Sequence, residues 1–413
     1  MEKIKIAVIG AGPAGMMAAI RASSLGQDVT IFEAKNSPGN KLLLIGKGRC
    51  NLTNTEDLQA FLKRFNRGDF LRDAFKKFFN TELISFFEER NLKLKVERQM
   101  RVFPESARSN GILDVLKKEL EKNKVNISFK SKVTGLAVSG AKAKGVFLEG
   151  VKKIEEADRV IMACGGASYS FTGSDGSGIN IAERLGHKII PLRAGLVSLD
   201  VKERFPKVLE GLTLRNIKLN FSAANKQIPT EVGEMIFTSS GISGPLVITY
   251  SGRIIDLLGQ GERVFVSIDL KPGLTMEQLD NRLLREFKSN AQKSIKNILK
   301  ELLPLRLIKV FVAALAIDPL KKCSQITLKE RKDIISLLKG FKMEVSSGRP
   351  IEEAMITRGG ISLKEINPRT MESRLVRGLY FCGEMIDVDA DTGGFNLQAA
   401  FSTGYLAGES AST

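Results

Sequence analysis

The residues that most clearly predict chemistry form a glycine-rich turn close to the amino terminus. An apolar run over 6–9 ends in the sequence GAGPAG at 10–15, and a second apolar run over 29–32 ends on Glu33. A strand, such a turn and a helix together bind the pyrophosphate of a dinucleotide, and an acid at this distance accepts hydrogen bonds from a ribose. The spacing therefore favours a dinucleotide-binding βαβ unit over a purely structural turn.

Each position in this turn has a physical role. Gly10 allows a tight turn, Gly12 lets the backbone approach the phosphates, and Gly15 lets the helix lie close to the sheet. Pro13 suits the first helical turn, where a missing N–H costs nothing and the helix dipole attracts an anion. We expect the Glu33 carboxylate to accept both hydroxyls of an adenosine ribose.

A second set of residues lies near the carboxyl terminus. An apolar run over 378–382 stops at Gly383 and Glu384, and residues 391–398 open the last predicted helix. We expect Glu384 to hold a ribitol hydroxyl and the free N–H groups of 394–397 to stabilise negative charge on a reduced flavin. An enzyme with a single NAD-binding domain does not need this returning segment. The two ends of the chain therefore predict FAD as the tightly bound cofactor.

A predicted strand over 159–163 adds a weaker signal of the same kind. It stops at Cys164-Gly165-Gly166, and small residues end the corresponding strand of two-dinucleotide-binding flavoproteins, where the chain passes close beneath the cofactor. No second G-x-G-x-x-G follows a strand in the middle of the chain, so a separate NAD(P)H domain is not encoded. Any NAD(P)H must bind transiently in the substrate cleft.

Composition describes an ordinary globular protein of two or three domains. The 413 residues are 43% apolar and 26% charged, and no stretch outside the glycine turn is apolar and long enough to suggest a membrane span, so we expect a cytoplasmic protein. The four cysteines lie far apart and there is one histidine, His187, which excludes a multi-histidine metal site; we predict no metal. We expect His187 to have a structural role at a helix end rather than a catalytic one.

The net charge of +17 is unevenly distributed. Between residues 275 and 342 there are fifteen Lys and Arg against seven Asp and Glu, and 15 − 7 gives +8 on less than a fifth of the chain. Such a segment binds nucleic acid in some proteins and is a solvated helical face in others. Because aromatic residues are not interleaved with these charges, we favour the solvated face over a nucleic-acid site and expect no membrane partner. RNA binding stays open as an alternative.

The periodicity of apolar residues divides the chain into four parts. We predict the first part of an α/β FAD-binding domain over 1–190 and a β-rich insertion over 191–272, where the apolar period is two. A helical part follows over 273–345, with capping boxes that begin at Thr275 and Thr327. The second part of the FAD-binding domain covers 346–413.

Several segments resemble a known family, the BaiN-like flavoproteins, also called the aminoacetone-oxidase family of FAD-binding enzymes. The resemblance covers nearly the whole chain and lies in five segments: KLLLIGKGRCNLTN at 41–54, RVFP at 101–104, TGSDG at 172–176, GISGP at 241–245, and residues 379–408. It implies a Rossmann-like, two-dinucleotide-binding FAD domain of the α/β class, with an inserted β-barrel-like part and a small helical part.

The resemblance also implies that residues 41–52 pass beside the flavin ring and the pyrophosphate, so that Arg49, Cys50 and Asn51 become candidate flavin contacts. For Cys50 we favour packing over a role as a nucleophile. The chain departs from the family pattern at Lys47, where a glycine is usual, and at Ser239, where a histidine is common. Phe395 stands where a tyrosine is frequent, which removes a hydroxyl from the predicted flavin edge.

These arguments give one set of predicted cofactor-binding residues. The set is Gly10, Gly12, Pro13, Ala14, Gly15, Glu33, Ala34, Lys35, Lys41, Gly48, Arg49, Cys50, Asn51, Leu52, Val133, Ala163, Cys164, Gly165, Gly383, Glu384, Gly394, Phe395, Asn396 and Leu397. The sequence does not identify catalytic residues or an oligomeric state.

The leading hypothesis is an FAD-dependent oxidoreductase that transfers a hydride through flavin N5 to or from a small organic substrate, with NAD(P)H as a transient electron donor. The alternative reaction is oxidation of an amine or ketone substrate by FAD, followed by reoxidation of the flavin by oxygen. A hypothesis from another class is an RNA-modifying or RNA-binding flavoprotein that uses the basic helical insertion, motivated by its +8 charge. A flavin-bound sensor with little turnover is a third.

Overall fold

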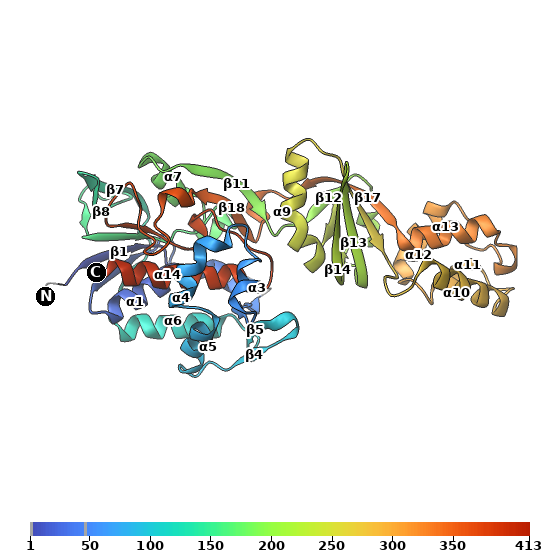
Figure 1. Cartoon of the computed structure of the whole chain (residues 1–413), viewed down its shortest axis with the longest axis horizontal. Helices are drawn as coiled ribbons and strands as arrows, with labels where there is room; N and C mark the ends of the chain where they lie inside the picture. The colour runs from blue at the N-terminus through green and yellow to red at the C-terminus, as the bar shows by residue number, and fades with distance from the viewer. Residues whose placement is uncertain (1–2, 45–47) are drawn as a thin grey trace. The chain divides into compact units, whose positions relative to one another are not determined.

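The computed structural model describes residues 3–44 and 48–413, and the chain folds into two compact units (Figure 1). The two ends of the chain, up to Gly195 and from Pro350, form one of them, called here the terminal unit. The segment Leu196–Arg349 forms the other, the inserted unit. An insertion between two halves of one domain is the arrangement that the family resemblance implies.

A five-stranded, all-parallel sheet forms the centre of the terminal unit. Its strand order is β19-β10-β1-β2-β6, so the last strand of the chain lies at one edge beside a strand from its middle. These strands are β1 (Lys5–Ile9), β2 (Asp28–Phe32), β6 (Asn126–Ser128), β10 (Arg159–Met162) and β19 (Leu379–Phe381). The strands β1, β10 and β19 are apolar and largely buried, as expected for a parallel sheet covered on both faces.

The first and last helices of the unit pack closely against each other. Helix α1 (Pro13–Ser24) and helix α14 (Phe395–Ala411) lie side by side in Figure 1. A Cβ added at Gly404 would lie 2.2 Å from the Ala14 carbonyl oxygen, and one added at Gly408 would lie 2.3 Å from that of Ala18. The contact therefore requires glycine at both positions, and it joins the two ends of the chain.

Shorter elements surround this sheet. The helices are α2 (Asn40–Leu44), α3 (Leu58–Leu62), α4 (Arg72–Lys77), α5 (Asn80–Glu88), α6 (Asn110–Lys122) and α7 (Ser177–Arg184). There are also three small sheets. The first has β5 (Arg101–Pro104) between β3 (Thr53–Asn54) and β4 (Leu94–Val96), and the second has β8 (Lys142–Leu148) between β7 (Val133–Ser139) and β9 (Glu155–Glu156). The third pairs β11 (Ile189–Gly195) with β18 (Ile356–Ile361). One apolar core connects them with the central sheet.

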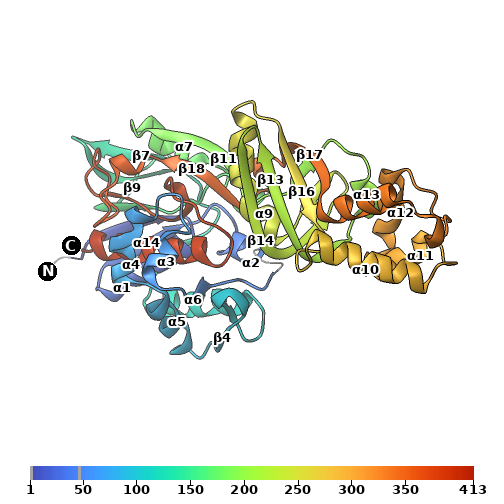
Figure 2. The same ribbon diagram turned by 45° about the vertical axis from the view of Figure 1, so that its right-hand side comes forward.

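The inserted unit contains a closed barrel of six strands, shown in Figure 2, and helices that lie in the chain between these strands. The barrel order is β12 (Leu199–Val201), β15 (Gly241–Ser243), β14 (Lys226–Phe237), β13 (Thr213–Ala223), β16 (Val264–Asp269) and β17 (Phe341–Gly348). Burial alternates along β13 and β16, which matches the apolar period of two and places one face of each strand in the core. The helices are α8 (Pro206–Leu209), α9 (Pro245–Gly259), α10 (Met276–Ser289), α11 (Ile295–Leu299), α12 (Leu305–Leu315) and α13 (Leu328–Lys339).

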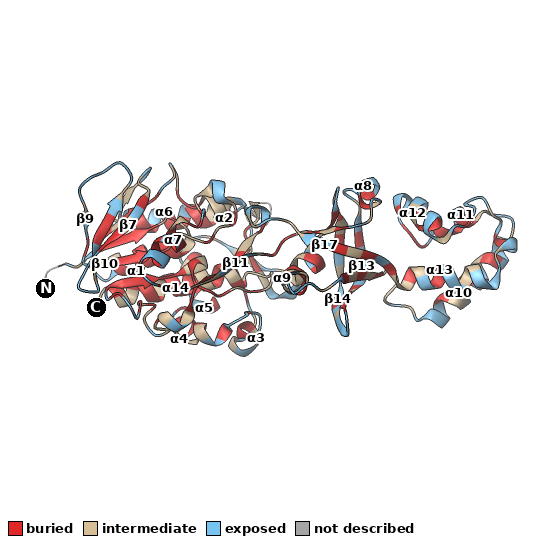
Figure 3. Cartoon of the chain, turned by 90° about the horizontal axis from the view of Figure 1, so that it is seen from above, coloured by how far each residue is buried: buried red, intermediate tan, exposed pale blue. Residues whose placement is uncertain are grey.

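Both predicted capping boxes are present. The Thr275 hydroxyl accepts from the Gln278 amide and the Thr327 hydroxyl accepts from the Glu330 amide, so α10 and α13 begin where the sequence predicts. Figure 3 shows that α10 and α13 each carry a buried face and an exposed face. Such amphipathic helices are stable when the apolar face packs against a neighbour.

The predicted boundaries differ in detail from the structure. The compact units divide at 195/196 and 349/350, where the sequence predicted 190/191 and 345/346. The predicted helical part ends in the strand β17, and the β-rich part contains the 15-residue helix α9. No described residues form a helix of the length and apolarity that a bilayer crossing requires. The family departure at Lys47 lies outside the described residues.

Candidate active site

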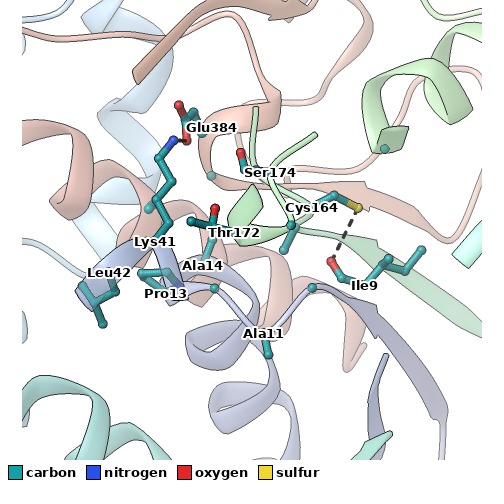
Figure 4. A pocket seen from close by; sticks show the side chains of 18 of the residues that line it. Ile9, Ala11, Pro13, Ala14, Lys41, Leu42, Cys164, Thr172, Ser174 and Glu384 are labelled. Carbon is teal, nitrogen blue, oxygen red and sulfur yellow. Dashed lines mark hydrogen bonds and ion pairs between the residues drawn. The ribbon is translucent and has the colours of Figure 1, made fainter. Parts of the chain in front are cut away.

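A deep cleft lies in the terminal unit at the carboxyl ends of β1, β2, β10 and β19. It encloses about 1430 Å³ of space between atoms, part of which is open to solvent. Figure 4 shows residues that line it, including Pro13 and Ala14 from the glycine turn and Glu384 from the end of the chain. Ligands of parallel α/β sheets bind in such a crevice, outside the carboxyl ends of the strands.

The glycine turn has the geometry that the sequence predicts. Gly10 has φ +100°, and a Cβ there would lie 2.7 Å from the Ala163 carbonyl oxygen; a Cβ at Gly15 would lie 2.0 Å from the Gly10 carbonyl oxygen. By contrast, no atom in the described part of the chain lies within 4 Å of a Cβ added at Gly12. Gly12 is also the N-cap of α1 and supplies no side chain to its first N–H groups. The open backbone and the helix dipole make this end of α1 an anion site.

Glu33 is held beside this turn at the end of β2. Its side chain is buried, and its two oxygens accept from the Ala11 amide at 2.7 Å and from the Lys35 amide at 2.8 Å. These bonds fix the orientation of the carboxylate and leave further lone pairs free, since each carboxylate oxygen can accept more than one hydrogen bond. Gly173 approaches the same carboxylate, because a Cβ added there would lie 3.7 Å from Glu33 Oε1.

A polar network crosses the other part of the cleft, as Figure 4 shows for Lys41 and Glu384. Lys41 Nζ lies 2.6 Å from Glu384 Oε2 and donates to Ser168 Oγ at 2.6 Å. Glu384 Oε1 accepts from the Thr357 amide at 2.6 Å and from Ser168 Oγ at 3.1 Å. Only about a fifth of the Lys41 and Glu384 side chains is exposed, at 17% and 21%. The network therefore joins four segments of the chain at a point that is largely shielded from solvent.

The start of α14 forms a third part of the cleft. Gly394 is the N-cap with φ +95°, and a Cβ there would lie 2.5 Å from the Thr53 carbonyl oxygen. Asn396 Oδ1 accepts from the Ala390 amide at 2.9 Å, and Asn396 Nδ2 donates to the Ala390 carbonyl oxygen at 2.9 Å. These two bonds hold the preceding loop against the start of the helix. Because no side chain caps this 17-residue helix, its first N–H groups are available to negative charge.

Two of the thiols in the terminal unit, Cys50 and Cys382, are buried, and a third, Cys164, is partly exposed at the cleft. Burial raises the pKa of Cys50 and of Cys164 to about 12, and it raises the pKa of Cys382 further. Cys164 lines the cleft, and its Sγ lies 3.7 Å from the Ile9 carbonyl oxygen, the contact dashed in Figure 4. A thiol in this state is a poor nucleophile. The geometry therefore favours packing for Cys50, as the sequence argument does.

His187 lies away from the cleft. It is 2% exposed, and its ring nitrogens contact the Ala182 carbonyl oxygen at 3.1 Å and Ser373 Oγ at 2.8 Å. Burial lowers its pKa from the usual 6.5. The neutral ring is therefore used in hydrogen bonds that close the end of α7, a structural role.

Most of the predicted cofactor-binding residues line the cleft. They are Gly10, Gly12, Pro13, Ala14, Glu33, Ala34, Lys41, Val133, Ala163, Cys164, Gly165, Gly383, Glu384, Asn396 and Leu397. Those that do not line it are Gly15, Lys35, Gly48, Arg49, Cys50, Asn51, Leu52, Gly394 and Phe395.

The residues off the cleft have other contacts. Arg49 forms a 2.6 Å ion pair with Glu97 and stacks on the Phe103 ring. Phe395 is 3% exposed and packs edge-on against Phe61, so it belongs to the apolar core rather than to a cleft edge. Asn51 is different, because its Oδ1 is buried with no hydrogen-bond partner in the described residues.

Sequence reasoning missed several lining residues. Thr172, Gly173 and Ser174 line the cleft, with Gly173 beside Glu33, and Thr357 and Thr403 contact the Gly383-Glu384 turn. The motif at 172–176, which carries part of the family resemblance, is the signal that could have identified the first three. Thr357 and Thr403 have no comparable local pattern, since only the fold brings them to Glu384 and Gly383.

The cleft fits FAD. A backbone cradle at Gly12, an oriented carboxylate at Glu33 and an uncapped helix start at α14 match the pyrophosphate, the ribose and the flavin in that order. Ser174 lines the cleft, and its Oγ is buried with no hydrogen-bond partner among the described residues, as expected of a group that bonds a cofactor. The sheet, the turn and the returning carboxyl-terminal segment together define a Rossmann-type FAD-binding oxidoreductase.

Comparison with known proteins gives the particular family. Residues 4–410 match the model described as HI0933-like protein Rossmann domain. The chain is 33% identical over 98% of its length to the 3-dehydro-bile acid delta(4,6)-reductase of Clostridium scindens, and 30% identical over 98% to the ribosomal RNA dihydrouridine synthase of Escherichia coli. It covers 98% and 97% of those proteins. The chain belongs to the HI0933-like family and is an FAD-dependent oxidoreductase, as the sequence predicted.

A solved structure shows the same fold. The 3-ketosteroid delta1-dehydrogenase of Sterolibacterium denitrificans matches with a TM-score of 0.53 at 12% identity, over 100% of both chains. At this identity the likeness is one of fold alone.

Proposed function

We propose that this enzyme reduces a carbon–carbon double bond conjugated to a carbonyl group in a small organic molecule. The observation that carries the proposal is the uncapped start of α14 at the cleft, which can stabilise the negative charge that a flavin carries after reduction. The similarity over 98% of the chain to a 3-dehydro-bile acid delta(4,6)-reductase supports the substrate class, because the name of that enzyme describes double bonds next to a 3-keto group.

When bound, FAD supplies the hydride chemistry at N5. The chain would hold FAD through the start of α1 at the pyrophosphate, Glu33 at the adenosine ribose, and Glu384 at a ribitol hydroxyl. Lys41 and Ser168 hold the Glu384 carboxylate in one orientation. Asn396 fixes the loop that leads into α14.

The electron donor in this proposal is NAD(P)H, bound transiently. The sequence holds one glycine fingerprint, and the corresponding turn lies at the FAD cleft, so a nicotinamide donor needs a different site from that turn.

Anaerobic reoxidation of the flavin tests the substrate class. Holoenzyme reduced with dithionite is mixed with a 3-keto steroid that carries a 4,5-double bond, and with cyclohexenone. The oxidised flavin spectrum should return with these conjugated ketones and not with their saturated counterparts. Reoxidation by oxygen alone, with no response to any conjugated ketone, would contradict the proposal.

A second candidate substrate is a uracil base in RNA, which presents the same conjugated bond. The specific observation is a row of exposed lysines, Lys293, Lys296 and Lys300, at and beside α11, none of which has an ion-pair partner among the described residues. The similarity to a ribosomal RNA dihydrouridine synthase supports it. Binding of an rRNA transcript that weakens steeply with salt would favour this substrate, and no binding at low salt would remove it.

A further inference from the structure

The terminal unit contains a second cavity, which the FAD cleft does not include. It contains about 1120 Å³ of space between atoms, part of which is open to solvent, and it is lined by four cations, Lys63, Arg67, Arg72 and Lys364. Asp69 is the one acidic residue that lines it. We call this cavity the basic pocket.

The charges of the basic pocket are only partly compensated. Arg72 lies 2.8 Å from Asp69, and Arg67 lies 3.1 Å from Asp387, whose side chain is 3% exposed. Lys63 and Lys364 are exposed and have no ion-pair partner among the described residues. Two lysines without a carboxylate partner among the described residues therefore line the cavity, and this excess of positive charge favours an anion there.

The basic pocket and the FAD cleft share a wall. Leu71 lines the cleft, while its neighbours Phe70 and Arg72 line the pocket. On the other side of the wall, Ile386 and Val388 line the cleft and flank Asp387, the partner of Arg67. The Asn66 amide also donates to the Asp389 carbonyl oxygen at 2.9 Å, which fixes the two segments together. An anion in the pocket therefore lies next to the cofactor cleft.

We propose that the basic pocket binds the 2′-phosphate of NADPH and so makes NADPH the preferred electron donor. The proposal rests on the proposed function, in which a nicotinamide donor reduces the flavin. A phosphate monoester carries close to two negative charges at neutral pH, which suits the two unpaired lysines. NADH lacks this group, so the pocket distinguishes the two donors.

Binding of two nucleotide fragments tests the pocket directly. Calorimetry on FAD-loaded protein compares adenosine 2′,5′-bisphosphate with 5′-AMP, which differ only in the 2′-phosphate. The bisphosphate should bind more tightly, and the double variant Lys63→Gln/Lys364→Gln should weaken it by about tenfold, the effect of two partly exposed ion pairs. The control Lys117→Gln/Lys118→Gln removes the same charge from the exposed face of α6 and should change neither affinity.

The same variants separate this inference from the proposed function. Anaerobic reduction of the flavin by NADPH should need about tenfold more donor in the pocket variant, while reduction by NADH stays the same. Reoxidation of dithionite-reduced flavin by an enone does not involve the donor and should be unchanged. Equal affinity for the two fragments, an equal effect of the control variant, or a pocket that binds only an RNA oligonucleotide would overturn the inference. If an enone does not reoxidise the reduced flavin of the unmodified enzyme, the proposed function is contradicted instead of this inference.

Discussion

The terminal unit and the inserted unit differ in where they place polar and charged groups. The buried carboxylate and imidazole side chains among the described residues, Glu33, Glu119, Asp387 and His187, all belong to the terminal unit. The buried polar residues of the inserted unit are Thr230 and Ser251, two hydroxyls. Burying a carboxylate is costly unless it has partners, and among these four side chains it is Glu33 that lines the cleft. The comparison locates the chemistry in the terminal unit and gives the inserted unit a core that apolar alternation alone explains.

Removal of one carboxylate from each unit should give the largest difference in stability between the terminal and the inserted unit. Glu384→Ala leaves Lys41 with one partner and the Thr357 amide with none, and should lower the free energy of unfolding of the apoprotein by about 3 kcal/mol. Asp280→Ala removes the partner of Arg331 in the inserted unit, where about 1 kcal/mol is expected. Urea denaturation measures both. Equal losses would show that the network at the cleft is an ordinary surface ion pair.

Glycine-to-alanine substitutions sharpen the comparison in the backbone. Gly404→Ala forces a Cβ to 2.2 Å from the Ala14 carbonyl oxygen, so α1 and α14 must separate, at a cost of about 2 kcal/mol. Gly259→Ala, at the end of α9 in the inserted unit, meets nothing within 4 Å and should stabilise by up to about 1 kcal/mol. Thermal denaturation in the absence of FAD measures the change in stability of both variants. A harmless Gly404→Ala would mean that the two helices are not in close contact.

The pH dependence of stability should have opposite signs in the two units. Hydrogen bonds from Arg263 and Lys202 lower the pKa of Glu344 from 4.5 to about 2, so its stabilising effect is present above pH 4.5 and is lost as the pH falls toward about 2. Burial raises the pKa of Asp387 above 3.8, so its ionised form opposes folding at neutral pH and the penalty disappears in acid.

Two variants measure these contributions in urea denaturation over the acid range. Glu344→Gln should be less stable than the unmodified protein at neutral pH, and the difference should shrink below pH 4.5. Asp387→Asn should be more stable at neutral pH, and that advantage should shrink as the pH falls below the raised pKa of Asp387. Curves that shift in the same direction would contradict the assignment of the two environments.

The parts of the site that the sequence predicted are the local ones. The turn at Gly10 and the acid at Glu33 belong to one strand, helix and strand, so their spacing fixes their geometry. Thr357 and Ser168 were missed because they contact Glu384 across 27 and 216 residues of chain, and nothing in their own surroundings distinguishes them. Arg49 shows the reverse case. The resemblance predicted a flavin contact, but its side chain direction depends on Glu97 and Phe103, which no local pattern identifies.

The fold followed a similar rule. The parallel strands and both capping boxes were predicted because each is a short-range pattern of apolar period or hydrogen-bonding type. The strand β17 was assigned to the helical part, since its pairing with β12 and β16 is non-local and its short alternation follows directly on α13.

Titration of the apoprotein with FAD tests the central claim, that the terminal unit binds this cofactor with its nucleotide half at Glu33. The unmodified protein should bind one FAD per chain, and Glu33→Ala should weaken binding strongly, since two charge-assisted hydrogen bonds of about 1.5–3 kcal/mol each are lost. Asp280→Ala, in the inserted unit, should bind FAD as the unmodified protein does. Unchanged affinity in Glu33→Ala, or a protein that takes up no FAD, would contradict the account.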